Sequence, residues 1–385
     1  MGLNFEFVTS TRIIFENGSF NKVPGLIKQQ GSKVFIVTGK NTNLASQLSE
    51  WLTAIDIQSE IFKIYSEPTT SDIERGTELA RKTNCNVIIG IGGGSAIDSA
   101  KAIAALAPNK GELTDYLEVI GKGRKLEEKP LPCIAIPTTA GTGAEVTKNS
   151  VIKSTEHNVK VSLRSDLMYP KLAVVDPELT LTMPPHLTAA TGIDALTHLL
   201  ETFVSNLSNP FIDVLCREGM KRISTSLEPA FNNGNNLEAR ENMAMASMLG
   251  GMALASVKLG AVHGFAGPMG GMYPIPHGTV CACLLPAVME VNIEALKESK
   301  QKNKLLRFDE LARILTGNNS AVAGDGAIWV KQLVSKLQIP SLSDYQITAE
   351  SFPELVEKAK NSSSMKGNPV ELGDDQLREI LIKSL

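Results

Sequence analysis

The sequence lacks several features that would place it in a specialised class of protein. Its net charge is only −3 over 385 residues. The charged residues are interspersed, so there is no basic stripe that could neutralise a nucleic-acid backbone. No window reaches about 18 uninterrupted apolar residues, and the first eleven residues show no charged start followed by an apolar core. We therefore expect a soluble, cytoplasmic protein whose partners include neither a nucleic acid nor a membrane.

Cysteine is scarce and irregularly spaced. The chain has five cysteines, and an odd number without framework spacing favours reduced thiols in a cytosolic protein. Cys281 and Cys283 are two residues apart, which is not the spacing of a zinc knuckle, so we interpret them as small buried apolar side chains. Internal repeats and low-complexity linkers are also absent. The length favours two domains, because single hydrophobic cores usually stop growing near about 250–300 residues.

The first half of the chain alternates short apolar runs with amphipathic stretches. This alternation is typical of βαβ units that feed an open parallel sheet. The apolar runs predict strands at residues 34–37, 60–64, 87–91, 133–136 and 172–175. The amphipathic stretches predict helices at 44–52, 72–82 and 96–106, the second capped by Ser71 or Asp72. An antiparallel excursion is expected from residues 150–152 and 160–163.

The pattern changes in the second half, where apolar residues recur at helical spacing from Thr188 onward. The stretch 238–259 is rich in methionine, alanine, glycine and serine, small or pliable residues that let helices approach closely in a core. Pro184 and Pro185 mark the expected junction. We therefore predict an α/β domain with a parallel sheet and flanking helices at residues 1–183, and an all-helical domain at residues 184–385.

Two turns that follow buried strands are candidates for binding phosphate. Residues 92–95, Gly-Gly-Gly-Ser, open a helix and leave backbone N–H groups that a pyrophosphate can approach at the positive end of that helix. They do not form Gly-x-Gly-x-x-Gly, and glycines also serve tight turns. Residues 137–143 offer hydroxyls and bare backbone at the carboxyl edge of the sheet. Two such turns favour a dinucleotide. For Lys101, on the following helix, we expect ordinary solvation and pairing.

A candidate set of metal ligands lies in the second half. Asp194 and His198 are four residues apart in a helical pattern, so both side chains project from one face. His263 and His277 follow downstream, each beside a glycine. One carboxylate oxygen and three imidazole nitrogens suit Fe²⁺ or Zn²⁺, and the sequence leaves both ions open. The alternative is a surface Asp–His pair and hydrogen-bonded core histidines. We expect the remaining histidines, His157 and His186, to be structural or solvated.

These motifs resemble the iron-containing (group III) alcohol dehydrogenases. The resemblance rests on residues 92–101, 137–147 and 191–201, on both downstream histidine contexts, and extends to Asn368 and Pro369. It implies a Rossmann-like NAD(P)-binding domain, a helical metal-binding domain, and a catalytic metal in the cleft between them held by Asp194, His198, His263 and His277. The implied cofactor-binding residues are Gly39, Gly93, Gly94, Ser95, Asp98, Thr138, Thr139, Thr147, Lys160 and Leu179.

Two positions depart from the pattern of that family. Many members carry an acidic residue after the first strand, where it binds the adenosine ribose and repels a 2′-phosphate. This chain has Thr38, Gly39 and Lys40 there, so we expect NADP(H) to be tolerated as well as NAD(H). Gly267 stands where many relatives place a further histidine, so a proton relay through that side chain is missing.

The resemblance implies a metal-dependent alcohol dehydrogenase or aldehyde reductase that transfers hydride between an alcohol, aldehyde or ketone and NAD(P). It also implies a homodimer or a higher homo-oligomer. The first alternative is a zinc- and NAD-dependent enzyme of the glycerol dehydrogenase or dehydroquinate synthase type. The second is a nucleotide-binding protein without catalysis. Alcohols, hydroxyacids and polyols all remain possible substrates.

Overall fold

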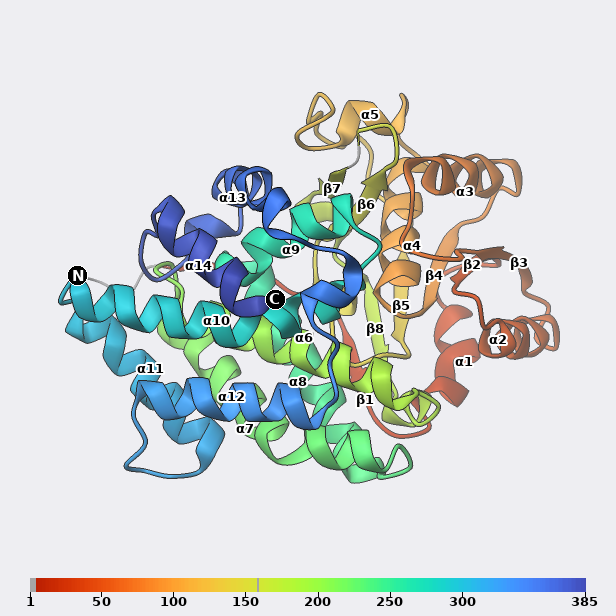
Figure 1. Ribbon diagram of the computed structural model, residues 1–385. Helices are drawn as coiled ribbons and strands as arrows, with labels where there is room; N and C mark the ends of the chain where they lie inside the picture. Colours follow the sequence, from red (N-terminus) through yellow and green to blue (C-terminus); the bar gives the residue numbers. More distant parts are fainter. Residues whose placement is uncertain (1–4, 158) are drawn as a thin grey trace. The chain divides into compact units, whose positions relative to one another are not determined.

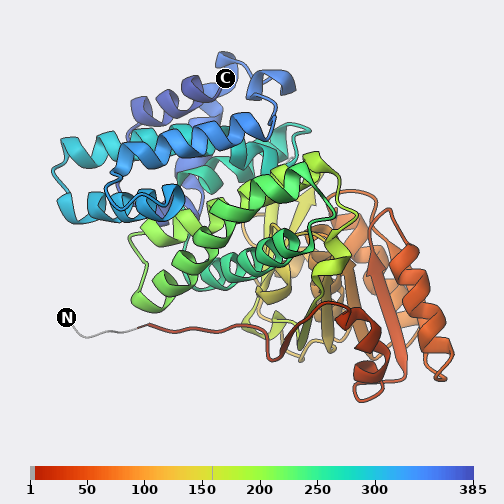
Figure 2. The same cartoon turned by 90° about the horizontal axis from the view of Figure 1, so that it is seen from below.

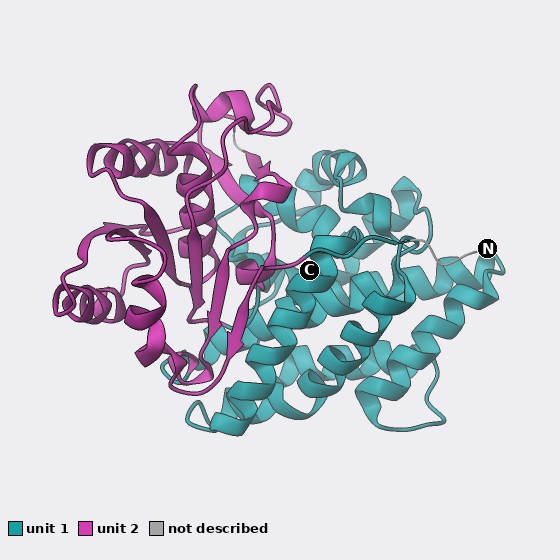
Figure 3. Cartoon of the chain, turned by 180° about the vertical axis from the view of Figure 1, so that it is seen from behind, with its two compact units in different colours: residues 1–8, 140–142, 181–385 teal, residues 9–139, 143–180 magenta. Residues whose placement is uncertain are grey.

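The chain forms two compact units in the computed structural model, which describes residues 5–157 and 159–385 (Figure 3). Unit 2 comprises Thr9–Thr139 and Gly143–Thr180. Unit 1 comprises Leu181–Leu385 together with Ala140–Thr142 and the described part of Met1–Val8. Unit 2 therefore ends at Thr180, close to the junction expected at Pro184, while a short piece of the turn at 137–143 groups with the helical unit.

A six-stranded parallel sheet forms the centre of unit 2 (Figure 1). Its strand order is β1-β8-β5-β4-β2-β3, and every neighbouring pair is parallel. The strands are β1 (Ile13–Phe15), β2 (Lys33–Thr38), β3 (Gln58–Lys63), β4 (Val87–Gly92), β5 (Cys133–Pro137) and β8 (Leu172–Val175). The five predicted strands are confirmed. β1 was missed because three half-buried residues show no readable period.

Helices cover both faces of this sheet, which explains why its central strands are apolar without interruption. On β2, Val34 and Ile36 face a core that includes α1 (Val23–Ile27) and α2 (Asn43–Thr53). Phe35 and Val37 face the opposite core, with α3 (Thr70–Lys82) and α4 (Gly94–Leu106). The short α5 (Leu113–Tyr116) and the antiparallel pair β6 (Asn149–Ser154) and β7 (Val159–Arg164) complete the unit.

The cap of α3 differs from the prediction. Thr69 is the N-cap: its hydroxyl accepts a hydrogen bond from the Asp72 amide at 3.2 Å, and the Asp72 carboxylate accepts one from the Thr69 amide at 3.1 Å. This reciprocal arrangement satisfies two amides at the start of the helix. Ser71 and Asp72, the residues expected to cap it, lie inside the first turn.

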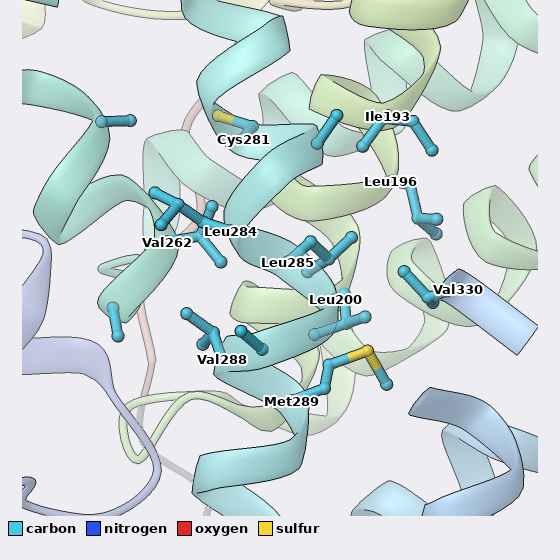
Figure 4. Close-up of a cluster of buried hydrophobic side chains, with 14 of the residues drawn as sticks. Ile193, Leu196, Leu200, Val262, Cys281, Leu284, Leu285, Val288, Met289 and Val330 are labelled. Atoms are coloured by element: carbon cyan, nitrogen blue, oxygen red, sulfur yellow. The ribbon is translucent and has the colours of Figure 1, made fainter. Parts of the chain in front are cut away.

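The described residues of unit 1 form helices joined by loops and include no strand, as expected (Figure 2). Its helices are α6 (Pro185–Val204), α7 (Pro210–Asn232), α8 (Leu237–Ser256), α9 (Ala261–Met272), α10 (His277–Glu298), α11 (Lys302–Thr316), α12 (Ala323–Lys336), α13 (Phe352–Asn361) and α14 (Asp374–Ser384). One hydrophobic core joins them. Figure 4 shows part of it, where Leu196 and Leu200 of α6 lie near Leu285 and Met289 of α10.

Helix α10 is the one helix in the described chain that is by itself long and apolar enough to cross a membrane. However, 78% of its most apolar window is buried inside the protein. Helices α8 and α9 pass the same test only as a pair, and they are bent by 95°. Buried core helices commonly have this composition, and α10 packs as one of them.

Candidate metal centre

Asp194 and His198 lie one turn apart on the buried face of α6. Both side chains are almost fully buried, and the Nε2 atom of His198 is 3.7 Å from Oδ1 of Asp194. The helix begins with Pro184 as N-cap and Pro185 at its first position, where the ring lacks an amide that would go unpaired. The expected placement on a single helix face is confirmed.

The two downstream histidines reach the same carboxylate oxygen. His263 lies in the first turn of α9, and His277 is the first residue of α10. Each places its Nε2 atom 3.6 Å from Oδ1 of Asp194. The His263 ring stacks on that of His198 with centroids 4.7 Å apart, and its centroid is 5.3 Å from that of His277. Three imidazole nitrogens thus surround one carboxylate oxygen within unit 1.

These donors fit a divalent cation better than they fit one another. Within the described chain, Oδ1 of Asp194 is buried and has no hydrogen-bond partner. The three nitrogens at 3.6–3.7 Å are too far for good hydrogen bonds. Ligands at about 2.0–2.2 Å from one ion lie about 3–4 Å apart, which matches this spacing. A buried carboxylate oxygen without a partner is costly, and a cation would remove that cost.

The electrostatics of the cluster favour a positive charge beside Asp194. Burial raises the pKa of the Asp194 carboxyl, but the imidazoles of His198, His277 and His263 outweigh burial and leave the pKa well below its usual range. Burial lowers the pKa of His198 to about 4, against the opposing effect of Asp194. His198 is therefore neutral near pH 7, which is the form that binds a metal ion.

His263 differs from His198 because its other ring nitrogen has an acidic partner. Burial alone would lower the pKa of His263, but Cys281, Asp194 and Glu201 raise it well above the usual value. The Glu201 carboxylate accepts hydrogen bonds from Nδ1 of His263 at 2.7 Å and from the Val262 amide at 2.7 Å. With Nδ1 donating to Glu201, Nε2 faces Asp194, where a bound cation would take the place of the second ring proton. Such a carboxylate fixes ring orientation and tautomer in metal sites.

Sequence reasoning assigned no role to Glu201, although a signal was present. Asp194, His198 and Glu201 occupy positions i, i+4 and i+7 of α6, which share one helix face. Glu201 is only 3% exposed. A second acidic residue on the same stripe as two proposed ligands, in a helix without lysine or arginine, could have been recognised as an internal partner.

Cys281 lies beside the cluster, which its interpretation as an apolar side chain did not anticipate. Its Sγ atom is 3.8 Å from Nε2 of His263 and 3.8 Å from Nε2 of His277. The donors of Asp194, His263, His277 and Cys281 all lie within 4.8 Å of one another. Burial raises the pKa of the Cys281 thiol to about 12. Cys283 points elsewhere, is only partly buried, and donates to the Pro340 carbonyl at 3.0 Å.

In unit 2, the two glycine-containing turns lie side by side. Strand β4 pairs with β5 on one side and β2 on the other, and chain connections leave β2 and β4 in opposite directions. Open α/β sheets bind ligands at such a point. The Thr138 amide donates to the Gly92 carbonyl at 2.9 Å. A Cβ atom at Gly92, whose φ is +148°, would lie 3.6 Å from the Gly39 amide nitrogen. Three strand ends therefore meet at this edge.

Several predicted cofactor residues line these ends. Gly39 follows β2, Gly93 is the N-cap of α4, and Gly94 and Ser95 form its first turn. A Cβ atom on Gly93 would lie 3.4 Å from the Thr139 side chain, so Thr139 borders the first turn. The structure brings these residues together, and their role in binding a cofactor remains a prediction.

Lys101 is buried, whereas a solvated side chain was expected from the sequence. It is 1% exposed, and its Nζ atom lies 2.9 Å from Oδ1 of Asp98. Nζ also donates to the Thr147 hydroxyl at 2.9 Å and the Ala144 carbonyl at 3.0 Å. The other oxygen of Asp98 accepts from the Val151 amide at 2.9 Å. The pairing was expected, but burial makes this network a tie between α4 and the segment 144–151.

Lys160 and Leu179, predicted only from the resemblance, have other partners in the structure. Lys160 lies on β7 and donates to Glu67 at 2.6 Å. Leu179 packs against the sheet core that contains β2 and β4. Any cofactor contact by Lys160 would have to share its charge with Glu67. His157 and His186 are exposed, as expected.

Almost the whole chain is similar in sequence to known proteins. Residues 10–177 match the iron-containing alcohol dehydrogenase family, and residues 188–385 match the C-terminal family of Fe-containing alcohol dehydrogenases. Alcohol dehydrogenase 4 of Saccharomyces cerevisiae is 34% identical over 377 residues, which covers 96% of both proteins.

Solved structures agree with these sequence matches. The alcohol dehydrogenase from Oenococcus oeni superposes with a TM-score of 0.91 at 32% identity, covering 99% of this chain and 100% of that one. Sulfoacetaldehyde reductase from Bifidobacterium kashiwanohense, in complex with NAD⁺, superposes with a TM-score of 0.87 at 29% identity, covering 99% of this chain and 98% of that one.

Proposed function

The chain belongs to the iron-containing alcohol dehydrogenase family and is an oxidoreductase that acts on CH–OH groups, and from this premise we propose a catalytic metal centre within unit 1. Its ligands are Asp194, His198, His263 and His277, and its ion is Fe²⁺ or Zn²⁺. The observation that carries the proposal is the approach of three imidazole nitrogens to a buried, unpartnered oxygen of Asp194.

When bound, a divalent cation supplies Lewis acidity that polarises a carbonyl oxygen or lowers the pKa of an alcohol by several units. The residues of the chain prepare the place for that chemistry. Asp194 provides the negative charge, and His198 is held neutral by burial. Glu201 holds the proton on Nδ1 of His263, so that Nε2 is free to bind. Burial keeps water away from these groups and strengthens their electrostatic interactions.

For the dinucleotide, we propose a site on the turns that follow β2, β4 and β5. Gly93, Gly94 and Ser95 present backbone N–H groups at the positive end of α4, which suits a pyrophosphate. The family implies NAD as cofactor, and the similar sulfoacetaldehyde reductase is seen with NAD⁺. The meeting of three strand ends at the switch between β2 and β4 supports this placement.

The same site is proposed to accept NADP(H). Gly39 leaves open space, since an added Cβ atom meets nothing within 4 Å, and Lys40 beside it is exposed. The positive charge favours a 2′-phosphate, and position 39 carries no carboxylate that would repel one. The second-order rate constant kcat/KM with NADPH should be at least a tenth of that with NADH. Gly39→Asp should lower the NADPH-to-NADH ratio by about tenfold or more, equal to about 1.4 kcal/mol.

Lys82→Asp is the matched control for the cofactor experiment. Lys82 is also exposed, but it ends α3 just before β4 begins, at the amino edge of the sheet. Its replacement lowers the net charge by two, whereas Gly39→Asp lowers it by one, so it is a strict test for a general charge effect, and it should leave the cofactor ratio unaltered. An NADPH efficiency below a tenth of the NADH value in the unmodified protein would contradict the proposal.

The metal centre is tested by replacing one ligand. His263→Ala should abolish metal retention and aldehyde-dependent consumption of NAD(P)H, because it removes one donor and leaves the buried Glu201 without the imidazole that it pairs with. His186→Ala is the matched control, since His186 lies on α6 but is exposed. Metal content is measured by elemental analysis beside turnover. Full activity of metal-stripped His263→Ala protein would refute the site.

Proton transfer must proceed without a side chain at Gly267. An added Cβ atom there meets nothing within 4 Å, so the position on α9 is open. We propose that water or the hydroxyls of the cofactor carry the proton instead.

We also propose that the protein is cytoplasmic and forms a homodimer or a higher homo-oligomer. The five free cysteines support the cytoplasmic location, and the family resemblance supports the oligomer. The alternative of a dehydroquinate synthase or glycerol dehydrogenase type is not favoured, since both halves match the alcohol dehydrogenase family.

A further inference from the structure

A thiol belongs to the group of donors at the metal centre. We propose that Cys281 binds the metal ion through its sulfur and biases the centre towards softer ions such as Zn²⁺ over Fe²⁺. The inference rests on the proposed metal centre and adds a ligand to it. Cys281 lies in a group of mutually close donors with Asp194, His263 and His277 of that centre.

The position of Cys281 follows from the helix that carries it. His277 and Cys281 are four residues apart on α10, so both side chains project from one face. The Sγ atom is fully buried and lies 3.8 Å from the Nε2 atoms of both His263 and His277. Sulfur and nitrogen ligands at about 2.3 and 2.0–2.1 Å from one tetrahedral ion lie about 3.6 Å apart. The observed separations are close to that value.

A hydrogen bond explains this arrangement less well than a metal ion does. The thiol is a weak donor and a weak acceptor, and it lies 3.8 Å from both imidazole nitrogens, which is long for either kind of hydrogen bond. A third group, Oδ1 of Asp194, lies 3.6 Å from the same two nitrogens and has no partner in the described chain. An ion among these four atoms would bind all of them. On binding, the S–H bond breaks, the proton passes to solvent, and a metal–sulfur bond forms without any change of oxidation state.

The thiol changes what the centre prefers. Thiolates favour zinc and other soft ions, whereas imidazole and carboxylate donors also serve iron. The Nε2 atom of His198 lies 3.7 Å from Oδ1 of Asp194. His198 is not in the group of mutually close donors that contains Cys281. Two overlapping sets of four therefore share Asp194, His263 and His277. One set is completed by nitrogen from α6, and the other by sulfur from α10.

Cobalt(II) provides a direct probe, because thiolate ligands add a charge-transfer band in the near ultraviolet to the weaker visible bands of the ion. The full-length protein is stripped of metal with a chelator and titrated with Co²⁺. The unmodified protein should show both kinds of band. Cys281→Ala and Cys281→Ser should keep the visible bands and lose the charge-transfer band. Cys283→Ala is the matched control, since Cys283 lies on the same helix and donates to Pro340, and it should keep both.

A competition experiment measures the predicted bias. Metal-free protein is offered equal amounts of Zn²⁺ and Fe²⁺ without oxygen, and the bound metals are quantified. The ratio of bound zinc to iron should fall by at least about tenfold in Cys281→Ser relative to the unmodified protein and Cys283→Ala. Circular dichroism of each metal-free variant identifies any that fails to fold, and the serine variant, close in size to cysteine, covers failure of the alanine variant.

The outcomes separate this inference from the proposed function. Visible cobalt bands without a charge-transfer band in the unmodified protein would overturn the role of Cys281 and leave the metal centre standing. A charge-transfer band that disappears in Cys283→Ala, but not in Cys281→Ala, would also overturn it. A failure of the unmodified protein to take up Co²⁺, Zn²⁺ or Fe²⁺ would overturn both the inference and the metal centre.

Discussion

At the scale of single residues, burial gives ordinary side chains unusual properties. Asp194 keeps a charge in the core because three imidazoles surround it. Lys101 is accommodated in the core because Asp98, Thr147 and the Ala144 carbonyl surround its amine. Each of these charges is expensive alone and acceptable in its network. The same reasoning identifies Glu145 as a residue whose burial costs stability.

Glu145 should make the stability of unit 2 depend on pH. The residue is 3% exposed, and burial raises the pKa of its carboxyl to about 7 from an ordinary value of 4.5, with Lys101 opposing only in part. Between those pH values the folded chain binds more protons than the unfolded chain, so stability falls as pH rises from about 4.5 to 7. Glu145→Gln should remove this loss and gain up to about 3 kcal/mol at pH 8 relative to pH 4.5.

Denaturant unfolding at several pH values measures this effect. The matched control is Glu156→Gln, since Glu156 is exposed in unit 2 and should leave the pH profile unaltered. If the difference between Glu145→Gln and the unmodified protein were the same at pH 4.5 and pH 8, burial of the ionised carboxylate would not be the cause.

At the scale of elements, the metal centre depends on how closely helices approach. Gly278 follows His277 in the first turn of α10, and a Cβ atom added to it would lie 2.4 Å from the Ala190 carbonyl oxygen on α6. Backbone cannot move aside as a flexible side chain can. Between α6 and α7, a Cβ atom added to Gly192 or Gly219 would lie 2.2 or 2.6 Å from a leucine side chain. Gly278 thus sets the spacing between α10 and α6 that brings His277 to Asp194.

Gly278→Ala should therefore separate α10 from α6. We expect a loss of about 1–3 kcal/mol in stability from overpacking and a fall in metal affinity of at least about tenfold as His277 moves from Asp194. Gly324→Ala is the control, since a Cβ atom on Gly324 in α12 meets nothing within 4 Å. Thermal unfolding and competitive chelator titration give the two values. Unaltered metal affinity in Gly278→Ala would show that the helix spacing does not govern the centre.

At the scale of the whole molecule, the two proposed sites belong to different units. All proposed metal ligands lie in unit 1, while the glycine turns that follow β2 and β4 lie in unit 2. A ligand stabilises the folded form of what it binds in proportion to the logarithm of its concentration. Metal and dinucleotide should therefore protect different parts of the chain.

Removal of metal should destabilise unit 1 selectively. A metal concentration about 100 times the dissociation constant adds about 2.7 kcal/mol to stability. Hydrogen exchange followed by mass spectrometry should show this as slower exchange in α6, α9 and α10 when metal is added back. The strands of unit 2 serve as the internal control. A metal-dependent change confined to β2, β4 and β5 would contradict the assignment.

The sequence by itself determined the class of fold and the kinds of donor. Local backbone geometry decides which side chains share a face of a helix or a strand. For this reason, uninterrupted apolar runs predicted strands covered on both faces, and apolar residues at helical spacing predicted the helices of unit 1. Asp194 and His198, four residues apart, could be placed on one helix face by the same argument. The predicted strands and the iron-containing alcohol dehydrogenase family are confirmed, and the assignment of the ligands stays a prediction.

Only the tertiary structure decided which distant residues meet. Glu201 and His263 are 62 positions apart, and Lys101 and Thr147 are 46 apart, so no local period links them. The placement of Cys281 beside His263 depends on how α9 and α10 pack, and β1 exists only because β8 lies beside it. Side-chain periodicity is fixed within a few residues of chain, whereas these contacts depend on packing between elements that the chain brings together only on folding.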